Sequence, residues 1–87
     1  MDTVLMEQQV TSAISSLTNQ LPAEQLEEMR DLVKAGERGI ALENLCTQIY
    51  EYDIVIDPAI LANIAEVGTA MGIDSKYWER ISTKGRE

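Results

Sequence analysis

The 87-residue sequence contains no histidine, and this absence excludes several kinds of catalytic and metal site. A histidine general base, a Ser-His nucleophilic pair and a His-ligated metal centre all require the missing imidazole. The single cysteine, Cys46, has no partner for an internal disulfide or a CxxC motif. The five glycines are scattered and form no phosphate-binding loop. We therefore expect no enzymatic activity, no cofactor and no metal.

Phenylalanine is also absent, and no apolar run approaches the ~20 residues of a transmembrane helix. The acidic start, Met1-Asp2, does not resemble a secretory signal peptide. With one cysteine and no export signal, the expected location is the cytoplasm. Hydrophobic residues make up 45% of the chain and charged residues 25%, which is typical of a folded domain. We expect one domain over residues 1–87, with a frayed tail at 82–87.

Basic residues are few: 7 lysines and arginines stand against 15 acidic residues, for a net charge of −8. The imbalance is confined to residues 1–57, which carry eleven acids and three bases, whereas residues 58–87 carry four of each. A field of this sign repels nucleic acid and anionic membranes and attracts basic partners. We predict a basic protein partner and no direct binding of nucleic acid or membrane.

Proline, glycine and capping residues divide the chain into helical segments. A first helix should begin after Asp2 or Thr3, because apolar residues recur at helical spacing at Val10, Ile14, Leu17 and Leu21. Pro22 and Gly36 should bracket a second helix. We expect further helices at 37–52, from Pro58 to Gly72, and briefly after Asp74. The predicted fold is therefore an all-α compact bundle of four to five short helices.

Three residues outside the helical stripes have structural interpretations. Cys46 flanks the apolar stripe of the third helix, which indicates a buried, inert thiol. Trp78 is expected to dock the short last helix on the bundle, and Gly68 to permit close helix packing. The Ile54-Val55-Ile56 run disfavours helix and predicts a short extended link buried against the bundle.

The third helix separates its two tyrosines. If Leu45 marks the centre of the buried face, Tyr52 lies about 20° away and Tyr50 about 140° away. Tyr52 is therefore predicted to be in the core, and Tyr50 to be exposed. An exposed tyrosine among carboxylates suits a contact with a cationic partner, because tyrosine often anchors interfaces and charge steers the encounter. Its expected neighbours on this surface are Glu43, Thr47, Glu51 and Asp53, and a plain solvated helix end is the alternative interpretation.

A second acidic surface is predicted on the second helix, where four carboxylates fall opposite the apolar stripe. They are Glu24, Glu27, Glu28 and Asp31. Like charges at i,i+4 destabilise a helix by ~0.2–0.5 kcal/mol per pair, which favours a role in binding a partner. A plain solvated helix face is the alternative interpretation. The predicted partner-binding residues are therefore Tyr50, Glu51, Glu43, Thr47, Asp53, Glu24, Glu27, Glu28 and Asp31.

The segment "LVKAGERGIALENLCTQIYEYDIVIDPAILANIAEVGTAMGID" resembles the MafI-type family of bacterial immunity proteins, and "AGERGIALENLCTQIYEYD", residues 35–53, is the centre of the resemblance. It covers roughly half of the chain. Members of that family are small helical proteins carried beside polymorphic, contact-dependent toxins. The resemblance implies tight binding and neutralisation of a cognate toxin domain, in several such systems a nuclease of the EndoU type. It implies no particular toxin and no oligomeric state.

Two other classes are consistent with a small acidic helical chain. An acyl-carrier-like protein would carry a modifiable serine after an aspartate at a helix start, and Asp74-Ser75 has that pair, although near the C-terminus and before Lys76-Tyr77. A non-enzymatic helical scaffold is the other alternative. A DNA-binding regulator conflicts with the charge, and the chain has no basic recognition helix.

Overall fold

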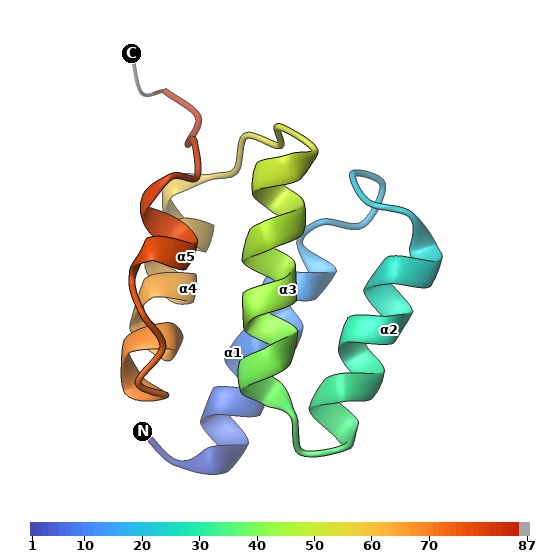
Figure 1. The fold of residues 1–87 in the computed structure, drawn as a ribbon, viewed down its shortest axis with the longest axis vertical. Helices are drawn as coiled ribbons and strands as arrows, with labels where there is room; N and C mark the ends of the chain where they lie inside the picture. Colours follow the sequence, from blue (N-terminus) through green and yellow to red (C-terminus); the bar gives the residue numbers. More distant parts are fainter. Residues whose placement is uncertain (86–87) are drawn as a thin grey trace.

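The computed structural model describes residues 1–85, which fold into five helices joined by short connections (Figure 1). The helices are α1 (Thr3–Ser15), α2 (Ala23–Lys34), α3 (Arg38–Glu51), α4 (Pro58–Ala70) and α5 (Lys76–Glu79). No strand forms within these residues, where the only extended pairings are two isolated bridges. The prediction of an all-α bundle is confirmed.

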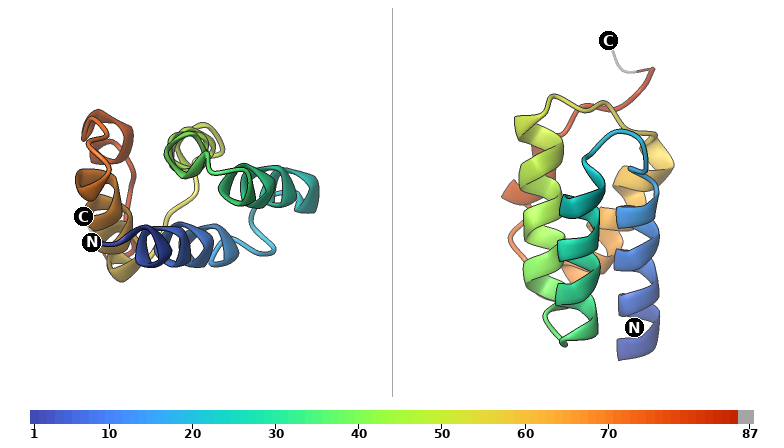
Figure 2. Two further views of the ribbon diagram at one scale, coloured as in Figure 1. Left: turned by 90° about the horizontal axis from the view of Figure 1, so that it is seen from below. Right: turned by 90° about the vertical axis from the view of Figure 1, so that its right-hand side faces the viewer.

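The helices form two layers, as Figure 2 shows end on. The layer that faces the viewer in Figure 1 contains α5, α3 and α2, and the layer behind it contains α4 and α1. Helix α3 lies at the centre and contacts α1, α2, α4 and α5, whereas α2 contacts only α1 and α3. The bundle measures 36 × 27 × 18 Å, so the two layers present its two broadest surfaces.

The core lies between the layers and is built from the apolar stripes that the sequence predicts. Leu45 is fully buried, which confirms the phase assigned to α3. Cys46 is buried beside it, as predicted. The buried hydrophobic residues are Val10, Ala13, Ile14, Leu17, Leu21, Leu26, Met29, Val33, Ala41, Leu42, Leu45, Cys46, Ile49, Ile56, Ile64, Val67, Trp78 and Ile81.

The helix ends follow local chemistry. The Asp2 side chain accepts a 2.8 Å hydrogen bond from the Leu5 backbone N–H and so caps α1. Gly36 and Gly72 follow α2 and α4 with φ of +85° and +73°, a left-handed conformation that glycine adopts without steric cost. Pro58 is the first residue of α4, where its missing N–H costs nothing.

Helix α1 is shorter than its apolar spacing predicts. It ends at Ser15, and the buried residues Leu17 and Leu21 reach the core from a turn instead of from a further helical turn. The Ser16 hydroxyl donates a 2.6 Å hydrogen bond to the Ala13 carbonyl oxygen. Asn19 has φ of +76°, which a helix cannot accommodate. Serine, threonine and asparagine side chains form hydrogen bonds with nearby backbone groups that compete with helix formation. Local hydrogen bonding therefore ends the helix here, although the apolar pattern continues.

The segment after α5 is held against the link between α3 and α4. The Ile56 N–H donates to the Ser82 carbonyl oxygen at 3.1 Å, and the Lys84 N–H donates to the Ile56 carbonyl oxygen at 2.9 Å. Thr83 is buried in the bridge that results. The predicted frayed tail therefore does not hold for residues 82–84, because backbone pairing fixes them; residues 86–87 lie outside the described part. Of the link, Ile56 is buried, Ile54 is half-buried and Val55 is exposed, so burial was predicted correctly for only part of it.

Candidate partner-binding face

The outward surface of α3 carries the tyrosine that the sequence predicts to be exposed. Tyr50 retains 45% of its accessible surface, and Glu51 and Asp53 are exposed beside it. Thr47 and Glu43, one and two turns earlier, are half-buried. The Thr47 hydroxyl donates to the Glu43 carbonyl oxygen at 2.9 Å, so it is already engaged within the helix. Of the five predicted residues at this surface, Tyr50, Glu51 and Asp53 are therefore the most accessible to a partner.

Tyr52 is not in the core, and the prediction that placed it there is wrong. Its side chain is 52% exposed, and its hydroxyl accepts a 3.1 Å hydrogen bond from Nε2 of Gln25 at the start of α2. Helical phase alone does not bury a side chain, since a neighbouring element must cover it at the same height. Tyr52 follows the last residue of α3, and the neighbour it meets there is the polar side chain of Gln25.

Arg80, the residue after α5, covers one face of the Tyr50 ring. Its guanidinium carbon lies 3.9 Å from the ring centroid, within the range of a cation–π interaction. The sequence analysis missed this contact, because the two residues are far apart in the chain and Arg80 lies outside α3. A hollow of about 250 Å³ opens beside the pair. It is lined by Ile49, Tyr50, Asp53, Ile54, Val55, Arg80, Ile81 and Ser82.

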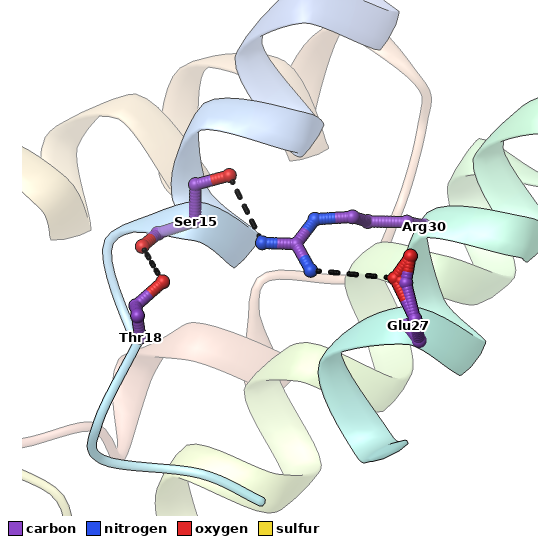
Figure 3. Close-up of polar contacts among 4 residues, drawn as sticks. All are labelled: Ser15, Thr18, Glu27 and Arg30. Carbon is purple, nitrogen blue, oxygen red and sulfur yellow. Dashed lines mark hydrogen bonds and ion pairs between the residues drawn. The ribbon is translucent and has the colours of Figure 1, made fainter. Parts of the chain in front are cut away.

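All four predicted carboxylates of α2 are exposed, and one of them is paired. Glu27 lies 3.7 Å from Arg30 one turn later, and Arg30 also donates to the Ser15 hydroxyl oxygen at 3.3 Å (Figure 3). This is the one ion pair within residues 1–85. Glu24, Glu28 and Asp31 thus stand without a basic partner among the residues that the structure describes.

The predicted acidic surface of α2 borders α3 directly. Glu28 and Asp31 of α2 border a hollow of about 380 Å³ together with Asn44 and Gln48 of α3, two polar residues that the sequence analysis did not single out. Glu43 lies apart, at the edge of another hollow beside the end of α4. We use the name acidic face for the exposed acids of α2 and of the end of α3, which are Glu24, Glu27, Glu28, Asp31, Glu51 and Asp53.

The buried thiol of Cys46 in α3 has a raised pKa. Burial raises the pKa of its thiol from the ordinary value of 9.0 to about 12; the negative charge of Glu43 adds to the rise, and the positive charge of Arg80 opposes it. A thiol with so high a pKa stays protonated at neutral pH, which makes it a poor nucleophile. This agrees with the inert thiol expected from the sequence.

Ser75, which the acyl-carrier alternative singles out, precedes the four-residue helix α5. Its hydroxyl donates a 2.9 Å hydrogen bond to the Glu79 carboxylate. Over the described range, no three metal-ligating side chains come together, and no helix is both long and apolar enough to span a membrane. Comparisons with protein-family models, with curated proteins and with solved structures find no match. The class that fold and surface define is a small all-α bundle with an acidic face.

Proposed function

We propose that this protein is an immunity protein that binds and neutralises a cognate bacterial toxin domain without catalysis. The observation that carries the proposal is the acidic face: its carboxylates on α2 and at the end of α3 are all exposed, and within residues 1–85 only Glu27 among them has a basic partner. Like-charged neighbours such as Glu24 and Glu28 destabilise a helix, so their presence favours a role in binding. The resemblance of residues 35–53 to the MafI-type family supports the same function.

The proposed toxin is a nuclease, with the EndoU-type ribonucleases as one candidate class. A nuclease is basic where it grips phosphates, and an acidic bundle placed on that surface would exclude the nucleic acid by competing for the same charges. The net charge of −8 would also speed the encounter, since opposite charges steer diffusion. Because such a toxin acts on nucleic acid inside the cell, the proposal places the protein in the cytoplasm.

The test uses the toxin domain encoded by the reading frame next to this gene. Stopped-flow association with that domain should slow steeply between low and physiological salt, while dissociation changes much less. Glu28→Lys on the acidic face should slow association more than Glu66→Lys on α4, although both variants change the net charge equally. An adjacent frame that encodes no toxin, or a toxin that the protein neither binds nor inhibits, would favour the helical-scaffold alternative. An intact mass with a phosphopantetheine group on Ser75 would instead support the acyl-carrier alternative.

A further inference from the structure

The outward surface of α1 carries no charged side chain at its centre, with Glu7 only at its edge, which sets it apart from the rest of this acidic molecule. The sequence has no charged residue from Gln8 to Ala23, although a quarter of the whole chain is charged. The exposed side chains of α1 include Val4 and Leu5, with 63% and 41% of their surface accessible, and after them Gln8, Ser12 and Ser15. We call this surface the α1 face. It belongs to the layer of α1 and α4, whereas α2 and α3 lie in the other layer (Figure 2).

Hollows lie along both sides of α1. One, of about 500 Å³, lies at the surface between α1 and α2, and the other, of about 320 Å³, lies between α1 and α4. Gln8 and Ser12 border both hollows, so with Val4 they form a ridge at i, i+4 and i+8 between two grooves. Helices pack by inserting such i±4 ridges into the grooves of a partner, and the commonest class in globular proteins uses these ridges on both helices.

We propose that the α1 face is the contact between two copies of this chain, with the Val4–Gln8–Ser12 ridge of each copy inserted beside α1 of the other. A second copy also carries a net charge of −8, so most pairs of faces repel each other. Two α1 faces do not, because neither contributes an unbalanced charge at the centre. A basic partner, in contrast, is attracted to the acidic face, and the identical copy is therefore the occupant that this surface fits.

The charges at the rim of the α1 face do not oppose this contact. On the α2 side, Arg30 is paired with Glu27. Lys34 and Glu7, which carry opposite charges, line the same hollow. On the α4 side, the Glu66 carboxylate accepts a 3.0 Å hydrogen bond from Nε2 of Gln9. The rim is thus close to neutral where the outer side of α2 is strongly negative.

The available area is sufficient for a weak contact. The α1 face lies on one of the two broadest sides of the bundle, which measure at most 36 by 27 Å. The α1 face covers only part of this side, so the contact buries less than the ~800 Å² per partner of a standard interface, which is the size range of weak association. Association through α1 would leave both acidic faces pointing outward, so a dimer would present two of them. This inference does not depend on the proposed function, because it requires no toxin.

The experiment measures the mass of the intact protein in solution by sedimentation equilibrium, from micromolar to millimolar concentration. We expect a monomer–dimer equilibrium that strengthens as salt is added, because salt screens the repulsion between two acidic copies. This is the opposite of the salt dependence expected for a basic toxin. Gln8→Glu, which keeps the shape of the side chain, should weaken the dimer at least about tenfold, since a two-fold contact then juxtaposes two added like charges.

Asn44→Asp on the opposite side of the bundle is the matched control, because it adds the same charge outside the contact. It should leave the dimer constant within about twofold, as a screened charge far from the interface changes little. Far-ultraviolet circular dichroism melts of both variants should match the unsubstituted protein, which separates loss of association from loss of fold. A monomer at every concentration and salt level would overturn the proposal. So would equal weakening by the two substitutions.

Discussion

The indole of Trp78 occupies the space that a side chain on residue 68 would need. A β-carbon built on Gly68 would lie 2.7 Å from Cη2 of Trp78, closer than carbon atoms approach without a shift in structure. The glycine is buried inside α4, and the tryptophan is the buried residue of the four-residue helix α5. Because so short a helix has little stability of its own, this contact fixes where α5 docks.

Gly68→Ala should therefore destabilise the protein. Alanine is the better helix former, and in an open site it would stabilise α4 by up to ~1 kcal/mol. Here overpacking against a rigid ring should prevail and lower the free energy of unfolding by ~1–3 kcal/mol. The loss is measurable by urea denaturation followed by tryptophan fluorescence, which reports on Trp78 directly.

Gly39→Ala in α3 is the matched control. Its added β-carbon would meet only the terminal methyl of Ile73 at 3.9 Å, an ordinary contact. The substitution should leave stability unchanged or raise it by up to ~1 kcal/mol. If both alanine variants were equally stable, the close approach of Trp78 to Gly68 would not exist in solution.

A second prediction concerns the pairing of the C-terminal segment with the link before α4. Lys84→Pro removes the N–H that donates to the Ile56 carbonyl oxygen, and should lower the free energy of unfolding by about 1 kcal/mol or more. Lys84→Ala keeps that N–H and alters only an exposed side chain, so its thermal melt should match that of the unsubstituted protein. Equal melts for the proline and alanine variants would contradict the pairing.

The third prediction is a pH dependence that arises from Cys46. Its pKa is about 12 in the folded protein and near 9 when unfolded, so above pH 9 the unfolded state loses a proton that the folded state keeps. Stability should therefore fall as the pH rises from about 9 to about 12, by up to ~1.4 kcal/mol per pH unit from this group.

Urea denaturation at about pH 8 and about pH 10.5 tests it. Cys46→Ala is less stable at both pH values because it leaves a cavity, but it should lose ~2 kcal/mol less between them, since it lacks the titrating thiol. Lysine and tyrosine titrations affect both proteins alike and cancel in the comparison. Identical losses in the two proteins would mean that the thiol titrates normally.

The sequence predicts the fold well where one residue decides a local structure. Asp2, Gly36, Pro58 and Gly72 mark helix ends, and the apolar phase around Leu45 identifies the buried side of α3. Apart from the early end of α1, which local hydrogen bonds of polar side chains decide, the failures occur where a distant segment determines the structure. Backbone hydrogen bonds with Ile56 hold the C-terminal segment, and no local sequence pattern near residue 83 predicts them.

The candidate site follows the same division. The outward direction of Tyr50 could be predicted from helical phase, because it is set by α3. The position of Arg80 on its ring depends on how α5 docks, and that docking depends on the contact between Gly68 and Trp78. The prediction that Tyr52 is buried failed for a related reason. Whether the end of α3 is covered depends on which part of α2 lies beside it, and that cannot be predicted from α3.

The last prediction separates these two tyrosines by their effects on toxin binding. They are the same residue type at the same end of α3, with 45% and 52% of their surfaces exposed, but Tyr50 lies under Arg80 and Tyr52 contacts Gln25. Each substitution by alanine should lower stability by no more than about 1 kcal/mol, the scale of one exposed cation–π contact or one hydrogen bond. Tyr50→Ala should weaken toxin binding by ~2 kcal/mol or more, the cost of an aromatic anchor at an interface, whereas Tyr52→Ala should bind almost normally.

Glu51→Lys extends this prediction to charge. A lysine at the C-terminus of α3 interacts favourably with the negative end of the helix dipole and should stabilise the free protein by ~0.3–1 kcal/mol. It should nonetheless weaken toxin binding, because it places a positive charge against a basic surface. A variant that gains stability and loses affinity cannot owe the loss to misfolding, and calorimetric melts with toxin titrations would show both effects. Should Tyr50→Ala and Glu51→Lys both bind at full strength, the toxin contact would lie elsewhere on the acidic face, on Glu24, Glu28 and Asp31 of α2.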